Sequence, residues 1–185
     1  MRTSPADLWD TIAADAGRES PLWTAALRPA GEQEREPVFS ELGEERYALG
    51  IETIYEGYLL HYGRPRLFGP EDRDTALLLG DYLYAHGLVR IEERGPVEAV
   101  DDLAELIAIS AYMRADGIPG DGALWAATAA LIGKGELDEA RTALRFEDDP
   151  GPLEQLAKQA AGDDPVARSG LEPAGGPWRR AKLQS

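Results

Sequence analysis

The chain has 185 residues, a length that fits one domain with a single core and an additional segment at one or both ends. It carries 34 acidic and 19 basic residues, a net charge of -15, which would repel nucleic-acid phosphate and anionic lipid. We therefore expect neither as a primary partner. The chain has no cysteine, so disulfides, thiolate chemistry and cysteine-bound metals are excluded.

The sequence also predicts where the protein acts. No apolar run approaches the roughly 20 residues needed to span a bilayer, and residues 1–9 lack the apolar core of a signal peptide. We expect a cytoplasmic protein with no membrane insertion. Lysine occurs only at Lys134, Lys158 and Lys182, and alanine and glycine are abundant, a composition associated with bacteria of high GC content.

Helical signals begin near the N-terminus. Ser4 followed by Pro5 is typical of a helix start, and apolar residues then recur at helical spacing until Gly17. A second short helix is predicted over residues 21–27. The polar, glutamate-rich segment 29–37 is predicted to be a loop.

The middle of the chain predicts a helical hairpin. From about Ser40 to Tyr62 the apolar face is wide, which indicates a central helix. A Pro/Gly turn over 64–71 follows. The next helix, from Asp74 to about Arg90, is apolar on nearly its whole circumference, and we expect it to be buried.

The remaining pattern is also helical. Helices are predicted over residues 97–114, 123–132, 136–144 and 152–161, and no strand signal occurs. The prediction is an all-α fold: one orthogonal or bundle-like domain of about six to eight helices over residues 1–161. A flexible Gly/Pro/Asp-rich tail is expected over residues 162–185.

The hairpin carries the candidate polar site, whose members are the only two histidines and three acids among apolar neighbours: Glu52, Glu56, His61, Asp81 and His86. Di-iron bundles use Glu-x-x-His pairs at i, i+3. Here Glu56 precedes His61, and Asp81 precedes His86, by five residues, so the side chains of each pair point about 140° apart on a helix. We expect no metal and no cofactor, and we predict that both histidines cap helix ends.

Asp81 follows Gly80 in the middle of the apolar helix, where an unpaired carboxylate would cost several kcal/mol. We expect it to be buried and compensated by an arginine, by a tyrosine hydroxyl or by an open cleft. Nucleophilic catalysis finds little support, because no Gly-x-Ser-x-Gly turn occurs.

Two basic groups stand out in this acidic chain. Arg64 and Arg66 make the turn of the hairpin basic and form a candidate anion site. Trp178, Arg179 and Arg180 form an aromatic-basic cluster near the C-terminus, which is a candidate docking peptide or a neutral tail. The other tryptophans, Trp9, Trp23 and Trp125, are predicted to be core or partner-contact residues.

The segment Ala76-Leu-Leu-Leu-Gly-Asp81, after the turn Arg64-Pro-Arg66, resembles trans-isoprenyl diphosphate synthases. Those all-α enzymes carry an Ala-x-Leu-x-Gly-Asp segment on a core helix. Their aspartate-rich motifs, which would bind magnesium, have no counterpart here. The resemblance is closest to the non-catalytic small subunit of two-component polyprenyl diphosphate synthases.

That resemblance implies a regulatory subunit without an active site of its own, which binds a protein partner as a homo- or hetero-oligomer. One alternative is a helical scaffold protein unrelated to isoprenoids. A second alternative is a small metal- or ligand-binding bundle that uses Glu56, His61 and Asp81.

Overall fold

The computed structural model describes residues 5–162, and within that range the chain is all-helical with no strand. This confirms the predicted fold class. The α-helices are α1 (Pro5–Glu19), α2 (Pro21–Ala25), α3 (Ala48–Tyr62), α4 (Arg73–Glu92), α5 (Val97–Asp116), α6 (Asp121–Leu131), α7 (Asp138–Glu147) and α8 (Gly151–Ala161). Three short 3₁₀ turns lie before α3: η1 (Ala30–Glu32), η2 (Ser40–Leu42) and η3 (Glu45–Tyr47).

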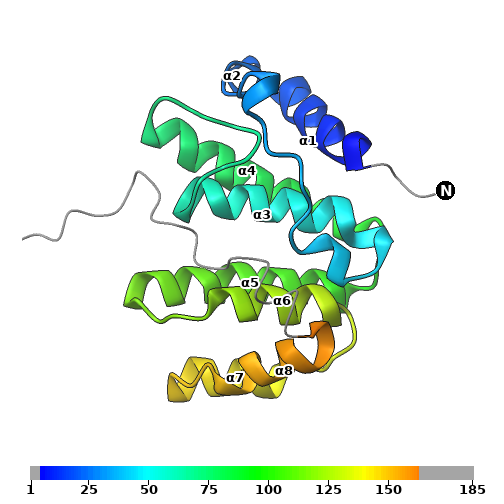
Figure 1. Cartoon of the computed structure of the whole chain (residues 1–185), viewed down its shortest axis with the longest axis vertical. Helices are drawn as coiled ribbons and strands as arrows, with labels where there is room; N and C mark the ends of the chain where they lie inside the picture. The colour runs from blue at the N-terminus through cyan, green and yellow to red at the C-terminus, as the bar shows by residue number, and fades with distance from the viewer. Residues whose placement is uncertain (1–4, 163–185) are drawn as a thin grey trace, which may run out of the picture.

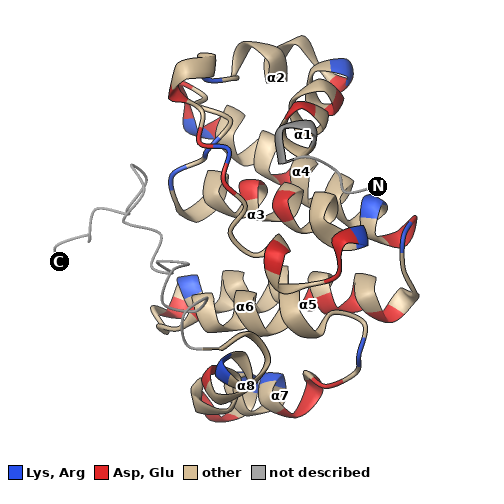
Figure 2. Ribbon diagram, turned by 45° about the vertical axis from the view of Figure 1, so that its right-hand side comes forward, with Lys and Arg blue, Asp and Glu red and all other residues tan. Residues whose placement is uncertain are grey.

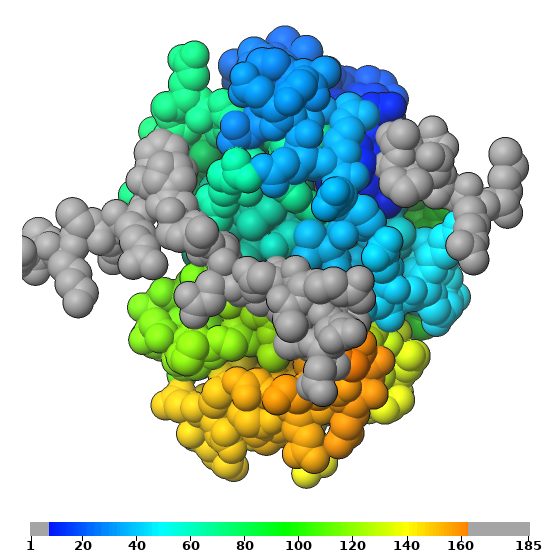
Figure 3. All heavy atoms as spheres, viewed as in Figure 1, coloured from blue at the N-terminus to red at the C-terminus, as the bar shows by residue number. Residues whose placement is uncertain are grey.

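The helices stack in layers that follow the order of the chain. Helices α1 and α2 lie at one end, the hairpin of α3 and α4 comes next, α5 and α6 follow, and α7 and α8 close the other end (Figure 1). The space-filling view shows the same progression from the N-terminal to the C-terminal end (Figure 3). Most contacts are therefore between elements close in sequence.

The helix α3 is the centre of the fold, as its wide apolar face predicted. Every residue from Gly50 to Leu60 is buried. Leu60 belongs to a core shared with α1, α2 and α4, whereas Ile51 and Ile54 belong to the larger core with α5 to α8. One helix thus joins both parts of the interior.

Two pairs of glycines bring α3 and α4 into close contact. Gly50 lies against Gly87, and Gly57 lies against Gly80, which is seven residues later on α3 and seven residues earlier on α4. A Cβ at Gly57 would lie 2.9 Å from the carbonyl oxygen of Gly80. Since backbone cannot move aside as a side chain can, the close approach of these helices requires glycine there.

Two predictions about these helices were wrong. The helix α3 begins at Ala48 and not near Ser40, because the chain before it forms the turns η2 and η3. The helix α4 is not buried all round: Leu78 is 60% exposed and Val89 is 52% exposed. It packs on α3 with one side only, and the helix that is buried on its whole circumference is α6.

The three tryptophans within the described range are buried, as predicted for core residues. Trp9 and Trp125 are fully enclosed, and Trp23 is 9% exposed. Trp178, Arg179 and Arg180 lie outside the described residues, as does the rest of the predicted tail from residue 163 onward.

Candidate functional site

Glu52 lies in the middle of α3, is fully buried and holds the segment that leads into η2. Its Oε1 accepts hydrogen bonds from the backbone N–H groups of three successive residues, Val38, Phe39 and Ser40, at 3.0–3.2 Å. Its Oε2 lies 2.8 Å from the Nη1 of Arg66. Both carboxylate oxygens are therefore occupied by donors of the protein itself.

Glu56, one turn later, does the same for the turn between α3 and α4. Its Oε1 accepts from the backbone N–H groups of Leu67 at 2.8 Å and Phe68 at 3.3 Å. Its Oε2 accepts from the backbone N–H and from Nε of Arg66, at 3.1 and 3.3 Å. The i, i+4 spacing of the two acids puts them on one face of α3, toward both loops.

Arg66 lies between the two acids and is only 5% exposed. Its guanidinium pairs with Glu52 and Glu56, donates to the carbonyl oxygen of Glu36, and lies over the rings of Trp9 and Tyr55 at 4.5 and 4.7 Å. Burial would lower the pKa of Arg66, but the two carboxylates outweigh it and raise the pKa above its ordinary value.

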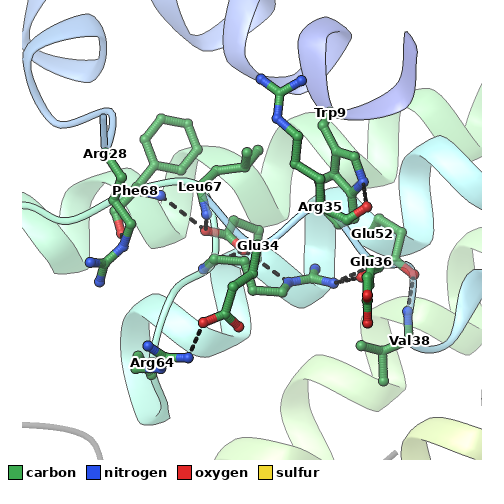
Figure 4. A network of polar contacts seen from close by, with 12 residues as sticks. Trp9, Arg28, Glu34, Arg35, Glu36, Val38, Glu52, Arg64, Leu67 and Phe68 are labelled. Carbon is green, nitrogen blue, oxygen red and sulfur yellow. Dashed lines mark hydrogen bonds and ion pairs between the residues drawn. The ribbon is translucent and has the colours of Figure 1, made fainter. Parts of the chain in front are cut away.

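The Arg66 cluster, which is Glu52, Glu56 and Arg66, fastens two loops to the central helix. Figure 4 shows Glu52 with Val38 of one loop, and Leu67 and Phe68 of the other. The loops are also joined to each other: Arg28 N–H donates to the carbonyl oxygen of Leu67 at 2.9 Å, and Glu34 N–H donates to that of Arg66 at 3.1 Å. Trp9 of α1 adds a third segment, since its indole N–H donates to the carbonyl oxygen of Arg35. The arrangement fixes the fold where α1, both loops and α3 meet.

The other predicted site residues do not join this cluster. Asp81 was predicted to be buried, but its side chain is 71% exposed at the edge of the contact between α3 and α4. It lies 3.1 Å from Nε2 of His61, whose side chain is 12% exposed and packs on the ring of Tyr84. Burial lowers the pKa of His61, and the charge of Asp81 opposes that effect only in part.

The histidines do not have the predicted contacts with helix ends. His61 is in the last turn of α3, as predicted, but its ring lies against Gly80 and pairs with Asp81 of the neighbouring helix. His86 is six residues before the end of α4 and lies 3.4 Å from Asp15 of α1. Asp15 is also paired with Arg90, and although burial raises the pKa of Asp15, that pair brings it below its ordinary value.

Two further buried polar groups were not predicted. Tyr58 donates to Asp121 and accepts from Arg114 at 2.9 Å, which ties α3 to the end of α5 and the start of α6. Asp102 pairs with Arg141 at 2.8 Å and accepts from the Gly133 N–H. The sequence indicates the pair of Asp102 and Arg141 only weakly. An acid that faces inward on a helix needs a basic partner, but the sequence does not show which one.

The two arginines of the predicted anion site both form ion pairs with glutamates. Arg64 is exposed and pairs with Glu34, whereas its neighbour in the predicted anion site, Arg66, is committed to Glu52 and Glu56. Within residues 5–162, no three histidine, aspartate or glutamate side chains lie close enough together to hold a metal ion. None of the helices in that range is long and apolar enough to cross a membrane.

One surface of the hairpin combines apolar and acidic side chains. From Asp74 onward, six residues of α4 are exposed, and we name them the α4 outer face: Asp74, Leu78, Asp81, Ala85, Val89 and Glu92. They follow one another at intervals of three or four residues, so they form one stripe along the helix. Acidic positions are visible along the ribbon of the hairpin and of α5 (Figure 2).

Comparison with known proteins adds no relative: no family model, no curated protein and no solved structure matches the sequence.

Proposed function

We propose that this protein is a non-catalytic helical subunit that binds another protein, and that its partner is a polyprenyl diphosphate synthase. The observation that carries the proposal is the state of the two glutamates on α3. Glu52 and Glu56 are fully buried, and every carboxylate oxygen accepts hydrogen bonds from the protein.

Magnesium–diphosphate chemistry needs several carboxylates with free oxygen atoms that converge on the metal ions. The hairpin offers none, because its inward acids hold loops and its outward acid, Asp81, faces solvent beside His61. The same geometry weighs against a ligand-binding bundle that uses Glu56, His61 and Asp81, since Glu56 is committed to Arg66 and the turn. A structural role for the hairpin fits better than a catalytic one.

The exposed side chains of α4 support a protein partner. Leu78 and Val89 are 60% and 52% exposed, and they are on the same stripe of a 20-residue helix. Val97, at the start of α5, is 74% exposed as well. Apolar side chains grouped on one surface are typical of an interaction site, whereas single exposed ones are ordinary.

The nature of the partner rests on the resemblance of the hairpin to isoprenyl diphosphate synthases. The burial expected for Asp81 would have strengthened that resemblance, and its exposure removes this support. The proposal relies instead on the paired helices, the basic turn and the absence of aspartate-rich motifs in the sequence.

The test is to mix the purified chain with a full-length polyprenyl diphosphate synthase from the same organism. We expect a complex by size-exclusion chromatography with light scattering, and a shift in the chain length of the prenyl product. The chain alone should release no diphosphate. If the synthase neither binds nor changes its product, the protein is a helical scaffold for some other partner.

A further inference from the structure

The α4 outer face alternates apolar and acidic side chains along its length. Its acids are Asp74, Asp81 and Glu92, and its apolar residues are Leu78, Ala85 and Val89. All six are exposed. Further acids, Glu93, Glu98 and Asp101, are exposed where α4 leads into α5. A segment that covers this face must therefore supply apolar side chains and positive charges together.

A second copy of the same face does not meet that requirement. Two copies could pack α4 against α4 as antiparallel helices related by a two-fold axis. The side of the α4 outer face that carries a given residue in one copy would then lie next to the same side in the other copy. Asp81 of one copy would then face the edge that carries Asp81 of the other. With a net charge of -15 on each chain, two copies also repel each other over longer distances.

The chain itself contains a segment of the complementary composition. Residues 178–183 read Trp-Arg-Arg-Ala-Lys-Leu, with two large apolar side chains, three positive charges and no acid. Among residues 5–162, most arginines close to the core already have acidic partners, for example Arg66, Arg90 and Arg141. The composition of residues 178–183 matches the α4 outer face in both respects.

We propose that residues 178–183 bind the α4 outer face of the same molecule and cover it until a partner replaces them. The inference rests on the proposed function, because the covered surface is the one that we assign to the partner. Trp178 and Leu183 would cover Leu78, Ala85 or Val89. Arg179, Arg180 and Lys182 would pair with Asp81 and the acids at the end of α4.

The covalent connection is longer than the surface that the segment would cover. Fifteen residues separate Gly162, the end of the described range, from Trp178. An extended chain of that length spans about 50 Å, whereas a helix of the length of α4 measures about 30 Å. A tethered segment also acts at an effective concentration in the millimolar range, so that weak individual contacts suffice.

Disulfide trapping tests the proposal directly, because the native chain has no cysteine. Cysteines are introduced at the centre of the α4 outer face and in the segment, as Ala85→Cys with Ala181→Cys. The control pair is Thr142→Cys with Ala181→Cys, where Thr142 is an exposed residue of α7, three and four residues after the acids Glu139 and Asp138. Both pairs are oxidised gently at low protein concentration, and the rate of intramolecular disulfide formation is followed by mass spectrometry.

We expect the Ala85 pair to close at least about tenfold faster than the Thr142 pair, as for a tethered segment with a preferred site. Adding Arg179→Glu and Arg180→Glu, or raising the salt to about 1 M, should remove most of that difference. Equal rates for both pairs would overturn the proposal, and so would a disulfide that forms only between two molecules.

A second measurement uses the unaltered chain. A zero-length carboxyl–amine cross-linker should join Lys182 to Asp81 or Glu92 in preference to the acids of α7, Asp138, Glu139 and Glu147. With only three lysines, peptide mass spectrometry identifies the joined residues unambiguously. No cross-link from Lys182 to α4 would contradict the proposal.

Neither measurement requires the prenyl synthase. If the segment closes on α4 but the synthase does not bind, the proposed function fails and the docking inference stands. If the synthase binds and both cross-linking tests are negative, the docking inference alone fails.

Discussion

The acidic side chains are buried on one helix of the central hairpin, α3, and exposed on the other, α4. On α3, Glu52 and Glu56 point into the protein and are neutralised by Arg66 and by backbone N–H groups. On α4, Asp81 points outward with 71% of its side chain exposed, between the exposed Leu78 and Ala85. Both helices are rich in apolar residues, so composition alone does not distinguish a structural acid from a surface acid.

The difference follows from what covers each helix. The loops on both sides of α3 present backbone N–H groups that donate to the two glutamates, and buried donors of this kind need acceptors. The carboxylate of Asp81 is largely in water and, within residues 5–162, has a single partner, His61. The inward acids thus belong to the fold, whereas Asp81 remains accessible to a partner.

The largest effect is expected on breaking the Arg66 cluster. Arg66→Met leaves two buried carboxylates without their cation, and we expect a loss of about 3–5 kcal/mol of unfolding free energy, measured by urea denaturation. Arg64→Met is the matched control, since its ion pair with Glu34 is exposed and should contribute about 0–1 kcal/mol. Similar losses in the two variants would mean that Arg66 is not the cation of this cluster.

A smaller loss is expected from separating the two helices. A Cβ at Gly87 would overlap the Cγ1 of Ile54 and lie 3.1 Å from the carbonyl oxygen of Gly50. Gly87→Ala should therefore cost about 1–3 kcal/mol by overpacking. Gly31→Ala is the control, because nothing lies within 4 Å of that position. An unchanged urea midpoint for Gly87→Ala would show that the helices are not in close contact.

The pH dependence of stability should depend on His61, which lies between the two helices. Burial lowers its pKa below the ordinary value of 6.5, so the folded protein binds this proton more weakly than the unfolded chain does. The stabilisation is then complete above pH 6.5 and is lost as the pH falls through the lowered pKa. In His61→Gln, the fall in melting temperature below pH 6.5 should be shallower than in the wild type. An identical slope would contradict the assignment.

The smallest effect on stability is expected on the α4 outer face. Leu78→Ser and Val89→Ser should change the unfolding free energy by less than about 0.5 kcal/mol, since both side chains are largely exposed. They should nevertheless weaken binding of the synthase at least about tenfold if this surface is the interface. Phe146→Ser, on α7 and 81% exposed, is the control and should bind as the wild type does.

Much of the fold could be predicted from helical spacing. The positions of α1 and of α4 to α8 follow from apolar periodicity and from Pro and Gly at their ends, and the central place of α3 follows from its wide apolar face. The start of α3 was missed because the residues of η2 and η3 continue the apolar pattern without forming an α-helix.

The site was harder to predict because its partners are not local. Glu52 and Glu56 were identified as polar residues of the core, but their bonds reach Val38, Phe39 and Leu67, which only the folded chain brings near. Arg66 was assigned to an anion site in a basic turn, although two buried acids one turn apart require a buried cation. Asp81 was wrongly predicted to be buried, because α4 has apolar residues on nearly all sides. Periodicity could not show that two of them, Leu78 and Val89, are exposed.

The central claim is that one arginine neutralises two structural glutamates, which commits Glu52 and Glu56 to holding the loops. Its most direct test compares Arg66→Met with the triple variant Glu52→Gln, Glu56→Gln, Arg66→Met by urea denaturation. The glutamines keep an acceptor for the loop N–H groups and remove the uncompensated charge, so we expect the triple variant to recover at least half of the stability lost in Arg66→Met. A triple variant that is less stable than Arg66→Met would contradict the account.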